Sequence, residues 1–304
     1  LPASAAFCMR YLIARSHAYT SLYFWTLVNE SEYYPDRDWR YNPIADRWAM
    51  RMGRWVKGVA PHGHVVSVHN GPRLPPFARR FALDPDAIDA VMFQSWGTRD
   101  EELGWLAAGI EEDVWAALEG WQGSAIMSEY GYERNPDLPL KLPNHAFCDV
   151  EHTRRGAWRG AFCALHVIHG FENSWGPFLV LDEDQPGLDC LLHLDRFFRQ
   201  VVPFDRLRSA SELVVPAECR RGGHPLALAA AGRDVVCVYL PVGGGVTLDL
   251  PVDAEYEGQW FDPRTGELLP VERAADEAFF FEAPGGTDQK GHPWDWVLAL
   301  RQVG

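Results

Sequence analysis

The chain has 304 residues, of which 47% are hydrophobic and 23% charged, and this balance is typical of a globular protein long enough for two domains. Its formal net charge of −14 at pH 7 would repel phosphate groups, and no cluster of lysine and arginine offsets that charge, so we expect no nucleic-acid partner. The chain also has no run of about 18 apolar residues, and we expect no insertion into a membrane.

Over the first two thirds of the chain, short apolar runs alternate with segments of helical periodicity. The runs are nearly continuous in apolar residues, as is typical of parallel strands that are buried on both faces. These predicted strands span residues 20–30, 63–70, 88–95, 124–130 and 162–170. The predicted helices span residues 43–59, 98–118 and 147–160. Strand followed by helix, repeated, predicts an α/β domain with a parallel sheet.

A second kind of pattern begins near residue 215. Short β-like runs continue to the C-terminus, separated by glycine-rich or Asp-Pro turns such as 243–245 and 262–266. About six or seven antiparallel strands predict a small β-sandwich. The amphipathic stretch 190–213 is expected to close the first domain. We therefore predict two domains, 1–214 and 215–304.

Two glutamates end predicted strands. Glu30 closes the first run, directly after Asn29, and Glu129 closes the fourth. In a parallel α/β barrel the active-site residues project from the carboxyl ends of the strands. A single glutamate in such a place is more often a solvated loop residue, but hydrolysis of a glycosidic bond needs two carboxyl groups, about 5 to 5.5 Å apart in a retaining enzyme. The pair therefore favours a retaining glycoside hydrolase.

The order of these glutamates resembles that of the large clan of barrel glycosidases in which an Asn-Glu pair ends strand 4 and a nucleophilic glutamate ends strand 7. The resemblance implies a (β/α)8 TIM barrel of which strands 4 to 8 are present, with strands 1 to 3 expected before Leu1. It also implies double displacement, with Glu129 as nucleophile and Glu30 as acid and then base. No metal or other cofactor is required.

Further side chains on the same predicted face are candidates for binding a carbohydrate substrate. Asn29 could hold the 2-hydroxyl of the sugar, His69 could bond a substrate hydroxyl or orient Glu129, and Trp175 could stack on the sugar ring. A structural His69 and a packed Trp175 are nearly as compatible with the sequence. The other candidates are Trp96, Tyr130 and Glu172.

A more particular resemblance is to the apiosidase-like hydrolases, the domain of unknown function 4038 group that includes glycoside hydrolase family 140. It is carried by the segments MRYLIAR (9–15), WTLVNE (25–30) and EYGYE (129–133). The segments QWFDPRTGE (259–267) and DWVLAL (295–300) resemble the small β domain, named a collagen-binding domain, that follows such barrels. The resemblance covers essentially the whole chain and implies a plant or bacterial polysaccharide as substrate. The chain departs from the family pattern at Glu30, where characterised members carry an aspartate, so the sugar itself is not implied.

Other interpretations remain open. His62 and His64 stand at alternate positions and could bind zinc, although they precede a predicted strand and would lie at the stability face of a barrel. Glu133, Glu151 and Glu172 are further acids that could replace an assigned carboxylate. The protein could also be a non-catalytic carbohydrate- or protein-binding protein with a degenerate barrel, and turnover of a glycoside by the purified protein would exclude this alternative.

Overall fold

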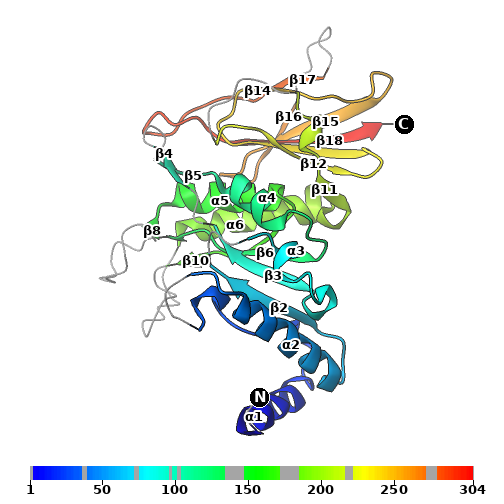
Figure 1. The fold of residues 1–304 in the computed structure, drawn as a ribbon. Coiled ribbons are helices and arrows are strands. Elements are labelled where there is room, and N and C mark those ends of the chain that lie inside the picture. The colour runs from blue at the N-terminus through cyan, green and yellow to red at the C-terminus, as the bar shows by residue number, and fades with distance from the viewer. Residues whose placement is uncertain are drawn as a thin grey trace. The chain divides into compact units, whose positions relative to one another are not determined.

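The computed structural model describes residues 3–35, 40–71, 75–95, 98–100, 104–133, 147–171, 185–215, 222–271 and 279–303. The chain divides into two compact units. Unit 1 comprises Leu1–Ser95 with Trp115–Ser128, and unit 2 comprises Trp96–Val114 with Glu129–Gly304. Figure 1 labels helices and strands of both units.

Unit 1 contains a parallel sheet that confirms the first four predicted strands. Across the sheet the order is β1 (Phe24–Thr26), β2 (Val65–Asn70), β3 (Ala90–Gln94) and β6 (Ser124–Glu129), the last residue of β6 being counted with unit 2. The pairs β1–β2 and β2–β3 are parallel, with Trp25 opposite Val66 and Val68 opposite Val91. The three valines are completely buried, which explains why these strands are apolar without alternation.

The helix predicted at 43–59 is confirmed as α2 (Pro43–Val59). The helix begins here because Asn42 accepts a hydrogen bond from the N–H of Ile44 and Pro43 occupies the first turn. Its apolar side faces β2, and at Gly53 a Cβ atom would lie 2.2 Å from the carbonyl oxygen of Ala87, so only glycine permits this approach. The other helical elements of unit 1 are α1 (Ala3–Ser16), η1 (Ser31–Tyr33), α3 (Phe77–Arg80) and η2 (Pro85–Ala87).

The helix predicted at 98–118 is wrong in its first half. In this segment the strands β4 (Thr98–Asp100) and β5 (Gly104–Ala108) form an antiparallel pair. Only the second half, α4 (Ile110–Leu118), is helical. Gly109 separates the two parts with φ 83°, a conformation that cannot belong to a right-handed helix. The acidic residues that follow it mark the true first turn, where negative charge favours the helix dipole.

Unit 2 contains the helices α5 (Val150–Phe162) and α6 (Pro186–Arg196), the second continued by a π-helical turn at Phe197–Val201. The helix predicted at 147–160 is therefore confirmed with a shift. The strand predicted at 162–170 is confirmed only in part, because α5 runs to Phe162 and only two dipeptides are extended, of which the first is a strand of the main sheet. These are β9 (His166–Val167) and β10 (Gly170–Phe171), and β10 forms a small parallel sheet with β7 (Tyr132–Glu133) and β8 (Phe147–Cys148).

The C-terminal part of unit 2 is built from antiparallel strands, as predicted. One sheet has the order β11 (Leu207–Ser209), β12 (Leu226–Ala230), β13 (Val235–Leu240), β18 (Trp296–Val303), β15 (Glu255–Phe261) and β16 (Leu268–Pro270). A second sheet pairs β14 (Gly245–Thr247) with β17 (Phe280–Glu282). Buried side chains of both sheets, such as Val238, Phe281 and Leu298, share one apolar core, as in a sandwich. Short 3-10 turns at Phe204–Arg206 and Ser211–Leu213 lead into it.

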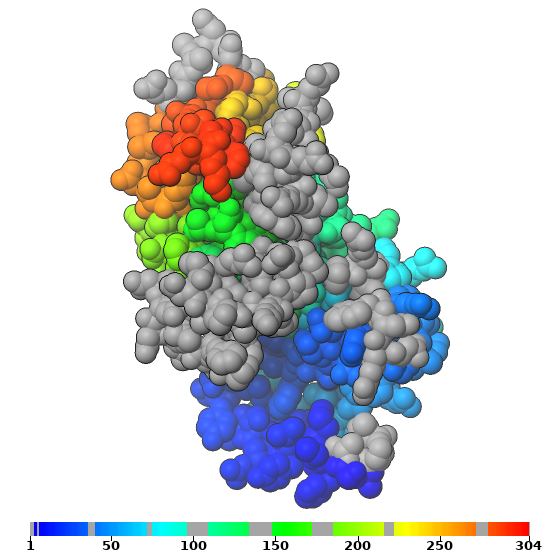
Figure 2. Space-filling view, turned by 90° about the vertical axis from the view of Figure 1, so that its left-hand side faces the viewer, coloured from blue at the N-terminus to red at the C-terminus, as the bar shows by residue number. Residues whose placement is uncertain are grey.

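Helix α5 packs directly on this antiparallel part. Trp158 of α5 is completely buried, and its ring centroid lies 6.0 Å from that of Tyr239 on β13 and 5.7 Å from that of Phe261 on β15. In the space-filling view, red and orange atoms of the C-terminal strands border on green atoms, the colour of the region around α5 (Figure 2). The β strands and α5 are therefore parts of one compact unit.

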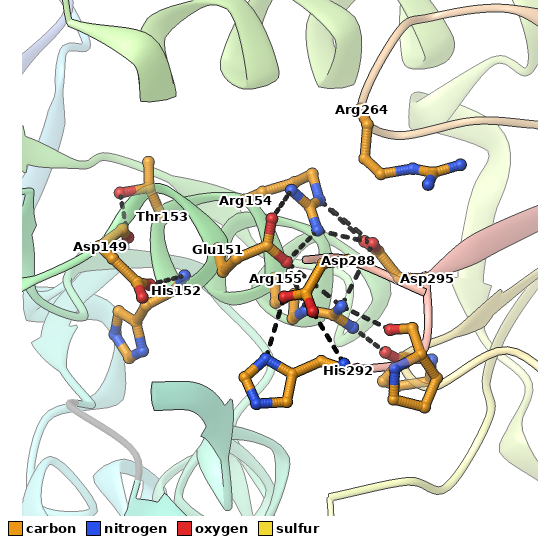
Figure 3. Close-up of polar contacts among 12 residues, drawn as sticks. Asp149, Glu151, His152, Thr153, Arg154, Arg155, Arg264, Asp288, His292 and Asp295 are labelled. Carbon is orange, nitrogen blue, oxygen red and sulfur yellow. Dashed lines mark hydrogen bonds and ion pairs between the residues drawn. The ribbon is translucent and has the colours of Figure 1, made fainter. Parts of the chain in front are cut away.

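A buried ion-pair network reinforces this packing (Figure 3). Arg154 lies 2.9 Å from Asp295 Oδ1, and Tyr239 donates a hydrogen bond to Asp295 Oδ2 at 3.1 Å. Glu151 accepts hydrogen bonds from Arg154, and Arg155 donates to the carbonyl oxygen of Pro293 at 2.8 Å. Burial by itself would raise the pKa of Asp295, but the two arginines outweigh it and lower that pKa to about 2.

Candidate active site

Glu30 lies four residues beyond β1, in the turn that leads into η1. Its backbone is left-handed, with φ 49° and ψ 62°, a conformation that is strained for a residue with a side chain. The N–H of Glu30 donates to Nδ1 of His69 at 3.4 Å, and its Oε1 accepts a hydrogen bond from Nε2 of Gln94 at 2.9 Å. His69 and Gln94 stand at the carboxyl ends of β2 and β3, so contacts from two strands hold the half-buried Glu30 at this edge of the sheet.

His69 is almost completely buried, and this burial lowers its pKa to about 4. The imidazole is therefore neutral near pH 7. Because Nδ1 accepts from a backbone N–H, the proton of the neutral ring lies on Nε2. The structure thus brings His69 to Glu30, and Nε2 is the atom that can donate to a polar group. Its role toward a substrate stays a prediction.

Buried polar side chains of β2 and α3 hold the turn that carries Glu30. Ser31 donates to Asn70 Oδ1 at 2.7 Å, and Nδ2 of Asn70 donates to the carbonyl oxygen of Met92 at 3.3 Å. Arg80 pairs with Asp46 at 2.6 Å, both of them buried, and also donates to Ser31 Oγ at 3.3 Å. These contacts satisfy groups that would otherwise be buried at a cost, and they fix the turn relative to β2 and α2.

A mostly apolar cavity of about 500 Å³ opens beside the same turn. It is lined by residues on both sides of Glu30, namely Val28 and Ser31, and by the aromatic side chains of Tyr34 and Trp48. Aromatic and apolar surface of this kind suits the apolar face of a sugar ring or an apolar leaving group.

The other predicted binding residues have different outcomes. Asn29 is exposed next to Glu30. Tyr130 is completely buried, and its hydroxyl donates to the carbonyl oxygen of Thr153 at 2.9 Å, so the position gives it a packing role and no direct access to substrate. The candidates outside the described residues are Trp96, Glu172 and Trp175.

Glu129 is the last residue of β6 and is half-buried. A cluster that the sequence analysis missed supports the segment after it. Nε2 of His152 lies 2.5 Å from the carbonyl oxygen of Tyr130, and the ring of His169 lies 4.6 Å from the ring of Tyr130. Burial, and to a lesser degree His152, lowers the pKa of His169 to about 3. His152 and His169 do not belong to a recognisable sequence motif, so the sequence alone could not identify them as a cluster.

Two of the reserve acids have structural partners. Glu133 is buried, and its Oε1 accepts a hydrogen bond from the N–H of Gly187 at 3.0 Å, in the first turn of α6, where a carboxylate stabilises the helix. Glu151 belongs to the network with Arg154 and Arg155. The third reserve acid, Glu172, lies outside the described residues.

The histidine pair of the zinc interpretation lies before β2, at the amino end of the strand. His64 contacts His17 edge to face with ring centroids 4.3 Å apart, and Trp25 donates to Nε2 of His17 at 3.1 Å. Within the described ranges, no group of three or more histidine, cysteine, aspartate or glutamate side chains is arranged to hold a metal ion. The same ranges contain no helix long and apolar enough to cross a membrane.

Comparison with solved structures identifies the type of fold. Over 96% of its length the chain superposes, with a TM-score of 0.70 and 17% identity, on a glycoside hydrolase family 5 protein from Bacteroides vulgatus ATCC 8482. A second structure, described as a glycoside hydrolase, matches 96% of the chain with a TM-score of 0.66 and 17% identity. The chain has the fold of these glycoside hydrolases. It covers 64% of the first protein, less than two thirds of its length, and 67% of the second.

Residues 213–301 match the family model "Putative collagen-binding domain of a collagenase". No curated protein sequence matches the chain. These comparisons confirm an α/β fold of the glycoside hydrolase kind, followed by a C-terminal region that is similar to the named domain family. The apiosidase-like resemblance, the domain boundary at 214/215 and the roles of individual residues stay predictions.

Proposed function

We propose that the protein is a retaining glycoside hydrolase that cleaves O-glycosidic bonds in a plant or bacterial polysaccharide. In this proposal β1, β2, β3 and β6 take the places of strands 4 to 7 of a TIM barrel, and the short β9 takes that of strand 8. The C-terminal strands form an accessory domain. The finer resemblance to apiosidase-like hydrolases is part of the proposal.

The observation that carries the proposal is the position of Glu30. In a chain with a glycoside hydrolase fold, Glu30 stands beyond the end of a parallel strand, with its backbone N–H bonded to His69 and its carboxyl bonded to Gln94. Glu129 ends β6 of the same sheet, at the end of the strand where such enzymes carry their second carboxylate.

The first step of the reaction forms a bond between a carboxylate oxygen of Glu129 and the anomeric carbon while the bond to the leaving oxygen breaks. Glu30 supplies the proton that the leaving oxygen needs. Because Oε1 of Glu30 accepts from Gln94, the proton is carried on Oε2. In the second step a water oxygen attacks the anomeric carbon, Glu30 takes the proton of that water, and the carboxylate of Glu129 is released.

The structure also supports a place for the leaving group. The cavity beside the Glu30 turn is lined by Tyr34 and Trp48, and a group bound there would lie close to the residue that protonates its oxygen. His69 stays a candidate for binding a sugar hydroxyl, and because its ring is neutral near pH 7 it adds no charge near the carboxyls.

The test is product release from a panel of aryl glycosides and of plant and bacterial polysaccharides, compared between the protein and its Glu129→Gln variant. We expect a sugar that is released by the protein and not by the variant, and NMR of the fresh product should show the anomeric configuration of the substrate. Inversion of configuration would contradict the retaining mechanism. Release from neither protein would favour the alternative of a non-catalytic binding protein.

A further inference from the structure

Glu32 is a second carboxyl close to Glu30 to which no role has been assigned. It is the middle residue of η1, only 2% of its surface is exposed, and neither carboxyl oxygen has a hydrogen-bond partner among the described residues. The backbone N–H groups of Glu32 and Gly71 lie near the carboxyl and favour its charged form, but they are not at hydrogen-bond geometry. A charged carboxylate in such a place is costly.

The groups around Glu32 do not compensate its charge. Arg80 attracts it, but that guanidinium is already paired with Asp46 at 2.6 Å. An ionised Glu30 would repel a negative charge on Glu32. Two further ionisable groups nearby do not supply a positive charge, since His69 is neutral and Tyr41 donates to Asp46 at 2.7 Å. On α2, the charged residues other than Asp46 are Arg47, Arg51, Arg54 and Lys57, and Arg54 and Lys57 pair with carboxylates of Asp84 and Asp89. Burial, helped by Glu30, raises the pKa of Glu32 against the opposing effects of Gly71 and Arg80.

Glu32 is also mechanically tied to Glu30. The N–H of Tyr33 donates to the carbonyl oxygen of Glu30 at 2.9 Å, which closes the 3-10 turn that contains Glu32. This turn packs on the end of β2 and on α2. A charge that forms on Glu32 must move toward water or stay uncompensated, and either change acts on the left-handed turn that sets the direction of Glu30.

We propose that Glu32 is a positioning residue for Glu30, a buried proton-binding carboxyl that keeps the Glu30 turn in place while it is protonated. Only its effect on turnover depends on the proposed hydrolase function; its proton binding and its effect on stability do not. The ionisation of Glu32 therefore links the pH to the geometry of this turn.

Stability has a defined pH dependence in this case. Because the pKa of Glu32 in the folded protein lies above its ordinary value of 4.5, the folded state binds more protons than the unfolded state above that pH. The contribution of Glu32 is therefore fully present below pH 4.5 and falls as the pH rises through the folded pKa. Glutamine has nearly the same shape and cannot ionise, so Glu32→Gln removes this loss.

The experiment compares three proteins, the parent, Glu32→Gln and Glu119→Gln, in urea unfolding between pH 4 and pH 8. Glu119 is an exposed glutamate of the same unit and serves as the matched control. We expect the difference in unfolding midpoint between Glu32→Gln and the parent to grow in favour of the variant as the pH rises, and the control to follow the parent. Parallel curves for all three proteins would overturn the proposal.

Activity provides the second readout. Because ionisation of Glu32 acts on the turn that sets the direction of Glu30, Glu32→Gln, which cannot ionise, should keep turnover at acidic pH and extend the alkaline limb of kcat/KM toward higher pH. Loss of turnover at every pH in a stably folded variant would overturn a positioning role, because Glu32 would then take part in the reaction itself. A pH-dependent stability difference without turnover in any of the proteins would support proton binding by Glu32 and contradict the hydrolase proposal alone.

If Glu32→Gln fails to fold, proton binding by Glu32 can still be tested in the parent protein. Carbon-13 NMR of the glutamate carboxyls should show one resonance that titrates above the ordinary range and shifts in Glu32→Asp. Ordinary titration of every glutamate carboxyl would refute the proposal.

Discussion

Nε2 of Gln94 donates a hydrogen bond to Oε1 of Glu30 at 2.9 Å, although the two residues are 64 positions apart in the chain. The bond joins the end of β3 to the turn after β1, and in the proposed mechanism it leaves Oε2 of Glu30 for proton transfer. Its effect can be measured separately from that of Glu30 itself.

Replacement of Gln94 by methionine keeps the length of the side chain and removes the donor. A hydrogen bond to a charged group contributes about 1.5 to 3 kcal/mol, so we expect kcat/KM to fall about 10- to 100-fold with little change in the folded structure. Steady-state kinetics on an aryl glycoside provides the measurement. Gln259→Met, on an exposed position of β15, is the matched control and should leave kcat/KM unchanged. An unaltered Gln94→Met enzyme would show that the bond does not orient Glu30.

The roles of Glu30 and Glu129 can be separated by the leaving group. Glu30→Gln removes the general acid, which typically contributes 10²- to 10⁴-fold, so hydrolysis of the polysaccharide should fall by about that factor. Substrates with a good leaving group such as dinitrophenolate need no proton, and their bond cleavage should be nearly unaffected. Glu129→Gln should abolish cleavage of both classes. An equal loss for both classes in Glu30→Gln would contradict its role as acid.

Buried His69 predicts a stability that depends on pH between its unfolded and folded pKa values. Its pKa falls from 6.5 to about 4 in the folded protein, so the unfolded state binds more protons between these values. The neutral ring therefore stabilises the fold above pH 6.5, and this contribution is lost as the pH falls toward 4. At about 1.4 kcal/mol for each pKa unit the loss amounts to about 3 kcal/mol.

His69→Asn tests this prediction, because an amide oxygen can replace Nδ1 as the acceptor for the N–H of Glu30 and cannot titrate. We expect the free energy of unfolding of the variant to depend less on pH than that of the parent between pH 4 and 6.5. Exposed His62 gives the control His62→Asn, which should retain the slope of the parent. Equal slopes for His69→Asn and the parent would disprove the assignment.

Asp295 predicts that α5 and the C-terminal strands unfold together. Removal of one partner from a buried ion pair costs about 3 to 5 kcal/mol, because the other charge stays buried, so Asp295→Asn should lower the free energy of unfolding by about this amount. We expect a single unfolding transition that shifts as a whole, measured by both far-UV circular dichroism and tryptophan fluorescence. Asp234→Asn breaks an exposed pair with Arg206 and should cost much less. Loss of the C-terminal signal alone would show that the strands fold independently of α5.

The same aspartate has a pH signature. Its pKa is lowered from 3.8 to about 2, so the folded state holds fewer protons than the unfolded state between these values. The stabilisation is present above pH 3.8 and decreases as the pH falls through 2. Asp295→Asn should show a smaller loss of stability than the parent when both are unfolded by acid, relative to their values at pH 7.

Much of unit 1 could be predicted because its elements are decided locally. The strands β2 and β3 are buried on both faces, and Asn42-Pro43 provides a local start signal for α2. The errors fall where local signals compete. Residues 98–108 have helical periodicity but form a strand pair that ends before Gly109. The apolar run at 162–170 contains the last residue of α5 and, after it, short strands of two residues.

The candidate site shows the same division. The sequence by itself determined that Glu30 follows a strand and that Glu129 ends one, since burial makes these strands apolar and leaves polar residues at their ends. Only the tertiary structure decided which residues meet Glu30. The hydrogen bonds of Glu30 with His69 and Gln94, and that of Tyr130 with Thr153, join residues far apart in the chain. The burial of Glu32 depends on the exclusion of solvent by the folded protein. The spacing of residues along one strand encodes neither the long-range bonds nor the burial.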